Sequence, residues 1–324
     1  MAHEFEELHQ ELRSVASDLL AKDRAVEWPV LAGAGWVGLE VPDEFGGAGA
    51  TFAEVAVICE EMGRAASANS YLGSAVLAVG TLKALQPGDT RDVLLSDVAS
   101  GTVRVAVALG SYEFVPDADG ADRLLVVTTD SEGAPVVDVA ALAVTRQPVV
   151  DETRRLATVS ADGIEAAEVL RFAGDPEEQD CRLHDRAAVA IACDSLGLSE
   201  AMLAATVSYA KVRHQFGRPI GSFQAVKHAC ADMQVAIAVS RQLVSTAVEA
   251  VAEGRQDAST ATAMAKSYTC STAVDVAGKA MQLHGGIGYT WESGIHVYLK
   301  RAILNRSLFG SPAAHRKRLA QRYL

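Results

Sequence analysis

Planar and aromatic side chains gather around one predicted turn in the second half of the chain. Arg213, Gln215 and Phe216 precede a glycine, an arginine and a proline, and Phe223 and Gln224 follow shortly after them. Glycine and proline end helices, so this run is expected to form a bend between two helical segments. An arginine can bind a phosphate through two parallel hydrogen bonds, and an aromatic ring can stack on another flat ring. The run therefore predicts a binding site for a nucleotide cofactor.

A second candidate element follows another helical segment further along the chain. Gln282 and Leu283 precede a histidine and the glycine pair Gly285 and Gly286. Glycine leaves backbone N–H groups open to an anion, because no side chain covers them. No metal site is predicted, because the histidines of both runs lack partners at ligand spacing, and packing or hydrogen bonding is the expected role for them.

The elements that position these residues must come from an acidic, aliphatic chain. Of its 324 residues 49% are hydrophobic and only 6% aromatic, so a core of alanine, valine and leucine is expected, which favours closely packed helices. With 29 basic and 41 acidic residues the net charge is −12. That balance argues against nucleic acid or an anionic membrane surface as a partner. Clustered arginines are therefore expected to mark local anion sites.

Cysteine usage and apolar runs bear on the compartment. The five cysteines lie far apart without a C-x-x-C pair, and reduced thiols in a cytosolic protein are the expected interpretation. No apolar run is expected to approach the ~20 residues of a membrane span. The acidic N-terminus lacks a signal-peptide pattern. A cytoplasmic location without a membrane partner is the prediction.

Helical periodicity marks both ends of the chain. Residues 1–100 carry apolar side chains at helical spacing, and Thr51 is a suitable N-cap for a helix that ends near Arg64. Residues 176–324 contain three longer periodic segments, at 183–213, 222–252 and 258–283. Helices of about thirty residues joined by short turns indicate an antiparallel four-helix bundle.

Residues 101–175 lack the helical pattern of the flanking regions, and their sequence predicts a small β-domain. Short β-branched runs alternate with turns rich in aspartate and glycine. The runs that predict strands are residues 102–109, 123–129, 135–139, 144–150 and 168–172. The predicted fold class is thus mainly α with a small β-domain between an N-terminal helical domain and a C-terminal helical bundle.

The two motifs and the order of the regions resemble the acyl-CoA dehydrogenase family. Residues 213–217 match the R-x-x-FG turn of that family, and residues 282–286 match its Q-x-x-GG element. The resemblance extends to a VP-x-x-x-GG connection at residues 41–47 and an E-x-x-GR helix end at residues 60–64. It implies the fold of the family, FAD as the cofactor, and oxidation of an acyl-CoA thioester to the 2-enoyl-CoA.

In this family FAD lies across a subunit interface. The resemblance implies that one subunit's β-domain holds the flavin ring, while the neighbour's bundle contacts the adenosine and phosphates. The residues of this chain that fall on the neighbour's half are Arg213, Gln215, Phe216, Phe223, Gln224, Gln282, Leu283, Gly285 and Gly286. Taken singly, the arginine and the glycines could merely end helices. The presence of both motifs at the family's separation favours the cofactor.

The half that holds the flavin ring has no match here. The family uses a T-E-P-x-x-GS-D type loop and a later strand with a tryptophan, whereas this chain's tryptophans are Trp28, Trp36 and Trp291, all outside the β-domain. Residues 107–114 stand where the loop belongs and lack its pattern. Relative to the family the middle β-domain is expected to be truncated by several strands. This subunit is therefore predicted not to hold the flavin ring by itself.

The catalytic glutamate of the family has no counterpart either. An ungapped count from the Q-x-x-GG element places Phe309 at its position, and phenylalanine cannot accept a proton. Relatives that carry the base on the first bundle helix would align it near Ala187, where Asp185 is the nearest candidate. Asp194 and Glu200 lie on the same predicted helix. An acidic residue on such a helix is more often a surface or buried-pair charge than a base.

Further arginines could contact the substrate. Arg186 resembles the arginine that opens the family's first bundle helix near bound CoA, and an ion pair with Asp185 or Asp194 is the competing interpretation. The C-terminal stretch is basic. We expect it to form a solvated helix face or a subunit contact rather than a CoA phosphate site, and its arginines are Arg301, Arg306, Arg316 and Arg318.

This chain has the family's nucleotide-binding motifs but lacks its flavin loop and its catalytic glutamate. The resemblance therefore implies that it is the degenerate subunit of a heteromeric acyl-CoA dehydrogenase of α2β2 type. A paralogous full-length subunit would supply the flavin ring and the base, and an electron-transfer flavoprotein would accept the electrons. Bacterial families of this heteromeric kind are known for bulky substrates, such as steroid side-chain CoA esters, and a shortened β-domain fits that comparison, but the sequence itself shows nothing about the acyl group. Two alternatives stay open: a self-sufficient homo-oligomer with Asp185 as a relocated base, and a non-enzymatic stabilising subunit that lost FAD. The missing loop argues against the first, and the retained motifs argue against the second.

Overall fold

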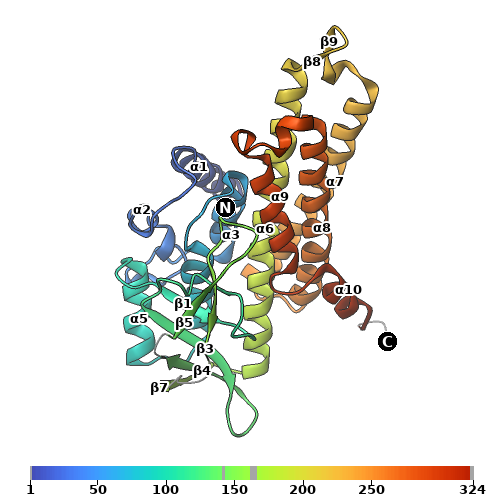
Figure 1. Cartoon of the computed structure of the whole chain (residues 1–324). Coiled ribbons are helices and arrows are strands. Elements are labelled where there is room, and N and C mark those ends of the chain that lie inside the picture. The colour runs from blue at the N-terminus through green and yellow to red at the C-terminus, as the bar shows by residue number, and fades with distance from the viewer. Residues whose placement is uncertain (1, 141–142, 161–165, 322–324) are drawn as a thin grey trace.

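The computed structural model describes residues 2–140, 143–160 and 166–321 of the chain. Figure 1 shows the N-terminal helices and the β-strands side by side on one flank of the long C-terminal helices. Most of the described residues are helical, and apart from the two-residue strands β8 (His214–Gln215) and β9 (Arg218–Pro219) the strands lie in the middle region. The predicted fold class is confirmed.

The N-terminal region consists of helices of different lengths. They are α1 (Ala2–Leu20), α2 (Trp28–Gly33), α3 (Phe52–Ala65), a π-helical stretch η3 (Leu72–Ala78), α4 (Val79–Ala84) and α5 (Asp89–Ala99). Among them α1 packs on α3, and α4 packs on η3 and α5. Thr51 begins α3 as predicted, because its Oγ accepts the N–H of Ala53 at 3.1 Å. The Glu54 carboxylate accepts the N–H of Thr51 at 2.8 Å in return. This capping box satisfies amides that a helix start leaves free.

The middle region forms two small sheets with strand orders β1-β3-β4-β7 and β2-β6-β5. The strands are β1 (Val105–Ala108), β2 (Val115–Pro116), β3 (Arg123–Thr129), β4 (Pro135–Ala140), β5 (Val144–Gln147), β6 (Leu156–Val159) and β7 (Ala166–Arg171). β1 and β3 pair in parallel, and the other neighbours in these sheets are antiparallel.

In the middle region two strands were missed and two were predicted too long, since β1 covers only Val105–Ala108 of the predicted 102–109. The missed strands are β2, whose two residues are too short for alternation to be recognised, and β6 (Leu156–Val159). The strand predicted over 144–150 ends at Gln147, because the next residue, Pro148, has no N–H for the ladder.

The C-terminal region is built on three long antiparallel helices, and two shorter helices pack on the third of them. The helices are α6 (Pro176–Val212), α7 (Gln224–Ala252), α8 (Ala258–His284), α9 (Ile295–Ser307) and α10 (Pro312–Gln321). The links are the hairpin strands β8 (His214–Gln215) and β9 (Arg218–Pro219) and the turns η4 (Ile220–Ser222), η5 (Gly285–Tyr289) and η6 (Trp291–Ser293). In Figure 1 the ends of α6 and α7 project beyond the rest of the molecule and carry the β8–β9 hairpin.

The N-terminal region meets the bundle where α3 crosses α6. A Cβ atom at Gly63 would lie 1.9 Å from the carbonyl oxygen of Asp194, and one at Gly197 would lie 1.9 Å from that of Glu60. Only glycine lets two backbones approach so closely. The two helices therefore touch backbone to backbone, and this contact fixes the first region against the bundle.

Two of the described helices are apolar enough to compare with membrane spans. By length and composition α6 and α7 could each cross a membrane, so the prediction that no run approaches this length was wrong. In α6 the apolar window is 83% buried inside the protein, as in the core helix of a bundle. In α7 only 28% of the window is buried, so the outer side of α7 presents an apolar surface.

The cysteines all carry free thiols. Cys59, Cys193 and Cys270 are buried, and burial raises the pKa of the Cys59 thiol to about 12. A thiol with so high a pKa is not a nucleophile at neutral pH.

Candidate functional site

The first motif forms the turn between α6 and α7. Arg213 leaves the helix in an extended conformation, so that Gln215 pairs with Arg218 across the β8–β9 hairpin. Phe216 and Gly217 make the turn with φ angles of +51° and +78°. Two successive positive φ angles are what a tight two-residue hairpin turn requires. As a result Phe216 stands at the tip of the hairpin and is 92% exposed.

Aromatic rings and guanidinium groups lie together behind this turn. The ring of Phe223 meets Phe216 edge-on, with centroids 6.2 Å apart, and the guanidinium of Arg218 lies 4.2 Å from the Phe223 ring centre. Arg213 is the C-cap residue of α6, since its backbone N–H donates to the carbonyl of Tyr209 at 2.9 Å, but within the part of the chain that the structure describes its guanidinium donates no hydrogen bond. The exposed amides of this motif belong to Gln215 and Gln224. The motif thus offers flat apolar faces and unused donors.

The second motif ends α8 at the same end of the bundle. Gly285 terminates the helix with a φ of +62°, and a Cβ atom on Gly285 or Gly286 would meet nothing within 4 Å. The buried ring of His284 stacks on Tyr209 of α6 at 4.5 Å, and its Nδ1 donates to the carbonyl of Ala280 at 2.8 Å. His284 therefore serves packing and joins the two helices that carry the motifs. The other residues of this motif are the exposed Gln282 and the half-buried Leu283.

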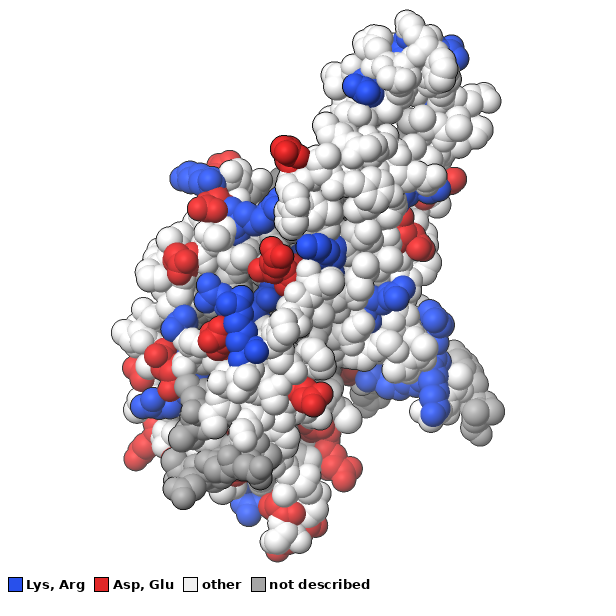
Figure 2. All heavy atoms as spheres, viewed as in Figure 1, with Lys and Arg blue, Asp and Glu red and all other residues white. Residues whose placement is uncertain are grey.

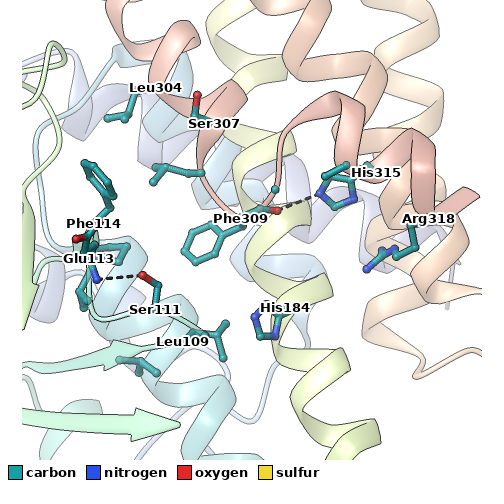
Figure 3. A pocket seen from close by; sticks show the side chains of 17 residues that line it. Leu109, Ser111, Glu113, Phe114, His184, Leu304, Ser307, Phe309, His315 and Arg318 are labelled. Carbon is teal, nitrogen blue, oxygen red and sulfur yellow. Dashed lines mark hydrogen bonds between the residues drawn. The ribbon is translucent and has the colours of Figure 1, made fainter. Parts of the chain in front are cut away.

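A cavity of about 610 Å³ lies between the β-domain and the bundle. Figure 3 shows its walls, which are the segment 109–116 after β1, His184 of α6, and side chains of residues 304–318. The sequence predicts that residues 107–114 stand where the family has its flavin loop and that Phe309 stands where it has its base, and residues of both segments line this cavity. The Phe309 ring points into it in Figure 3.

Phe309 is held in place by contacts behind the cavity wall. Its φ is +52°, an unusual value for a bulky residue. His315 Nε2 donates to the carbonyl of Phe309 at 3.0 Å, which Figure 3 marks as a dashed line. The buried ammonium of Lys266 donates to the carbonyls of Asn305 and Gly310 at 3.0 and 2.9 Å, and burial lowers the pKa of Lys266. These contacts hold in place the phenylalanine that the sequence predicts at the position of the family's base.

Two carboxylates lie near the cavity. Asp185 is buried and accepts hydrogen bonds from Ser259 Oγ and, at 2.7 Å, from Arg318 Nη2. Arg318 lines the cavity whereas Asp185 does not, so this carboxylate faces a guanidinium instead of the cavity. Among the described lining residues Glu113 is the only carboxylate, and its N–H donates to Ser111 Oγ at 3.0 Å. Sequence reasoning had not proposed Glu113, because it considered this segment only for what it lacks.

Asp194 belongs to a buried network. Its carboxylate accepts two hydrogen bonds from Arg301 at 2.9 and 2.6 Å and one from Asn305 at 2.7 Å, and it pairs with Arg154 at 3.1 Å. Burial alone would raise the pKa of Asp194, but Arg301 and Arg154 lower that pKa to about 2. So weak a base cannot take a proton from carbon at neutral pH. Glu200 is likewise tied to two arginines of α3 and α7.

Two arginine predictions need correction. Arg186 is buried and forms its ion pair with Glu40, not with either acid predicted for it. Its Nε donates to the carbonyl of Val76 at 2.7 Å, and its guanidinium lies 4.6 Å from the Phe52 ring centre. A role of Arg186 in substrate binding stays a prediction, and this packing argues against it. Arg301, expected on a solvated face, is only 2% exposed, because it neutralises a buried carboxylate.

Several residues that shape the site were missed. Glu40 lies 146 residues from Arg186 along the chain, and Asp194 lies 107 residues from Arg301, so no local pattern links them. The same holds for Arg154. Lys266 alone left a usable signal, because it interrupts an alanine-rich helical segment at an apolar position.

Most of the chain matches the models of one protein family. Residues 2–102 match the model of the acyl-CoA dehydrogenase N-terminal domain, and residues 183–324 match that of the C-terminal domain. The chain is 36% identical over 306 residues to acyl-CoA dehydrogenase IpdE2 of Mycobacterium tuberculosis, which covers 93% of this chain and 88% of that protein. This chain belongs to the acyl-CoA dehydrogenase family. Members of this family depend on FAD and are oxidoreductases of acyl-CoA thioesters.

Solved structures of acyl-CoA dehydrogenases share the fold. The chain superposes on the steroid acyl-CoA dehydrogenase Tcur3481-Tcur3483, G363A variant, with a TM-score of 0.87 and 27% identity, and 97% of each chain is covered. The ChsE4-ChsE5 complex from Mycobacterium tuberculosis gives a TM-score of 0.86 at 23% identity, covering 97% of this chain and 96% of that one.

The described residues of this acyl-CoA dehydrogenase suit one half of FAD. At the projecting end, unused guanidinium donors, two aromatic rings in edge-on contact and uncovered glycine amides fit the phosphates and the adenine. At the cavity, a fixed phenylalanine and a β-domain without tryptophan do not reproduce the family's flavin-ring site. The fit is therefore to the nucleotide end of FAD.

Proposed function

We propose that this chain is the non-catalytic subunit of a heteromeric acyl-CoA dehydrogenase, and that its bundle completes the FAD site of a paralogous subunit. One observation carries the proposal. The β8–β9 hairpin with the nucleotide motif stands at the projecting end of the bundle, at the opposite end of the molecule from the chain's own β-domain (Figure 1). A hairpin in that position can reach a cofactor held by a neighbouring subunit, but not the chain's own cavity.

The chemistry of the reaction supports this division of roles. Oxidation of an acyl-CoA needs a carboxylate to take the α-proton, and FAD supplies the acceptor for the hydride. Phe309 offers no proton acceptor where the family has its glutamate, and Asp185 and Asp194 are neutralised by arginines. The base and the flavin-ring site therefore fall to the partner subunit in this proposal.

Each nucleotide-binding residue has a defined task here. The guanidinium of Arg213 balances phosphate charge through charge-assisted hydrogen bonds. Phe216 and Phe223 present ring faces to the adenine, and the N–H groups of Gly285 and Gly286 approach the phosphates without a side chain in the way. Holding the nucleotide end in this manner positions the cofactor without taking part in proton or hydride transfer.

An apolar surface on the bundle supports an α2β2 assembly. Val235 and Val239 of α7 are 65% and 41% exposed, and Met264 and Tyr268 of α8 are 43% and 37% exposed. Exposed apolar patches of this kind mark protein–protein contacts in soluble proteins. We assign this surface to contacts between subunits.

Substrate, electron acceptor and location belong to the same proposal. The similarity to a steroid acyl-CoA dehydrogenase supports a CoA thioester with a bulky, steroid-like acyl group as substrate of the complex. An electron-transfer flavoprotein is the proposed acceptor, and the cytoplasm the proposed location.

A self-sufficient enzyme is the second candidate, and Glu113 favours it. A carboxylate at the cavity could replace the lost base if this chain held a flavin ring. In that case Glu113→Gln would abolish acyl-CoA oxidation by the purified chain, whereas the proposed function requires that the chain alone shows none.

The decisive experiment compares the chain alone with the chain co-expressed with its genomic neighbour. Visible flavin absorbance and the mass of the assembly are measured for both preparations. We expect colour only in the mixed complex, at one FAD per pair of unlike chains. Stoichiometric flavin in the isolated chain would support the self-sufficient enzyme, and a colourless complex would support a scaffold.

A matched pair of variants tests the cofactor assignment. In the complex, Arg213→Ala should weaken FAD binding about thirtyfold, the effect of one charge-assisted hydrogen bond of about 2 kcal/mol. The control is Arg255→Ala, which removes an exposed arginine paired with Asp257 at the opposite end of the bundle. Equal FAD affinity of both variants, measured by flavin titration of the apo-complex, would refute the assignment.

A further inference from the structure

The projecting end of the bundle has a charge opposite to that of the chain as a whole. The net charge is −12, yet residues 201–231 contain no aspartate or glutamate and carry Lys211, Arg213, Arg218 and Lys227. Figure 2 shows Lys and Arg atoms and no Asp or Glu atoms at this end of the visible face. A local positive charge on an acidic protein indicates a site for an anion.

The register of the β8–β9 hairpin decides which of these cations act together. Gln215 pairs directly with Arg218, and the N–H of Ile220 donates to the carbonyl of Arg213 at 2.7 Å. Side chains of directly opposed residues lie on one face of a β-ribbon, as do those of residues two apart on a strand. Arg213, Gln215 and Arg218 therefore share one face, which presents two guanidinium groups and one amide.

Phe223 orients the second of these guanidinium groups. Arg218 lies over the Phe223 ring at 4.2 Å, and the Phe216 ring packs edge-on against the same ring. A guanidinium that stacks on a ring keeps its N–H groups free in its own plane. Among the described residues those of Arg218 donate no hydrogen bond and remain available to a ligand.

We propose that Arg218 is a further cofactor-binding residue, which with Arg213 forms a clamp for the two phosphates of a dinucleotide diphosphate. The inference rests on the proposed function, because the diphosphate belongs to the FAD of the partner subunit. Two guanidinium groups on one ribbon face match two adjacent phosphates, and each can bind one of them through paired N–H donors. Arg213 alone would leave half of the diphosphate charge without a partner from this hairpin.

The test uses the apo-complex of this chain and its partner subunit, with FAD, ADP and adenosine as probes. ADP and adenosine are titrated as competitors of FAD. Arg218→Gln should weaken ADP and FAD binding at least tenfold and leave adenosine binding unchanged, because adenosine has no phosphate. Arg218→Lys keeps the charge but loses the planar fork, so an intermediate loss is expected.

Lys227→Gln is the matched control, since it removes one positive charge from the same end but from α7 rather than from the ribbon. We expect less than a twofold change for it. Equal losses in Lys227→Gln and Arg218→Gln would show general electrostatics and overturn the clamp. A loss of heteromer mass in Arg218→Gln with unchanged ADP affinity would assign the residue to the partner protein instead.

Arg213→Ala distinguishes failure of the Arg213–Arg218 clamp from failure of the proposed function. If Arg213→Ala weakens ADP binding and Arg218→Gln does not, the clamp is wrong and the proposed function stands. If neither variant changes ADP or FAD binding, the proposed function fails together with the clamp.

Discussion

Replacing Asp194 by asparagine tests whether this acid is structural, as the geometry indicates, or catalytic. Asp194 lies on α6 at the crossing with α3, and its carboxylate joins Arg301 and Asn305 of α9 to Arg154 from the β-domain. All three regions of the chain thus meet at one carboxylate. Asparagine keeps the shape of the side chain and removes the charge.

The size of the effect follows from the burial of the network. A pKa of about 2 for Asp194, against its ordinary 3.8, corresponds to roughly 2.5 kcal/mol in favour of the charged folded form. Removing one partner of a buried ion pair typically costs about 3–5 kcal/mol, because the remaining charge is left without compensation. The nearby Asp151 still faces both arginines, which favours the lower end of that range. We expect a loss of about 3 kcal/mol in the free energy of unfolding at pH 7.

Urea unfolding at several pH values measures this loss. The folded pKa of Asp194 lies below the unfolded one, so its contribution is complete above about pH 4 and is lost as the pH falls toward 2. Wild-type stability should therefore fall over this interval, and Asp194→Asn should lack that part of the slope. Glu200→Gln is the control, since it removes a partly exposed acid from the same helix and should cost no more than about 1 kcal/mol.

The structural role of Asp194 would be refuted if Asp194→Asn lowered the free energy of unfolding no more than Glu200→Gln does. It would also be refuted if the wild-type protein and Asp194→Asn lost stability identically between pH 4 and 2. A loss of activity of the complex in a variant of unchanged stability would restore Asp194 as a candidate base.

Three further predictions concern the cavity and its surroundings. Burial raises the pKa of Asp117 to about 6, so Asp117→Asn should raise the free energy of unfolding at pH 7 by up to about 3 kcal/mol. This gain in stability should vanish as the pH falls toward 4. An equal gain at pH 7 and pH 4 in urea unfolding would contradict the prediction. Lys266→Met leaves the carbonyls of Asn305 and Gly310 without their donor, so the free energy of unfolding in urea should fall by about 1–3 kcal/mol. An unchanged unfolding midpoint would rule out the role of Lys266 in holding this loop. Phe309→Glu places a carboxylate in the cavity, yet the purified chain should still not oxidise acyl-CoA with an artificial electron acceptor, because the proposed division of roles assigns the flavin ring to the partner subunit. Turnover by the purified variant would count against that division of roles.

Local sequence signals were sufficient for the long helices, although not for the strands β2 and β6. The capping box at Thr51 and the helical periodicity of α7 and α8 lie within short stretches, and the predicted bounds differ from the observed ones by at most two residues. α6 begins earlier than predicted, because Asp175 caps it and Pro176 occupies its first position ahead of the apolar pattern. The two motifs are also local, which is why they indicated the family without a structure.

By itself the sequence determined the family and the helical architecture, and it predicted a phenylalanine at the position of the family's glutamate, since each depends on residues close together along the chain. Only the tertiary structure decided which charges neutralise one another, because Glu40 and Arg186, or Asp194 and Arg301, meet across more than a hundred residues. It also decided that Asp185 faces Arg318 and that Glu113 lines the cavity. Burial and pairing set the charge and basicity of a side chain, and both depend on segments that sequence periodicity does not connect.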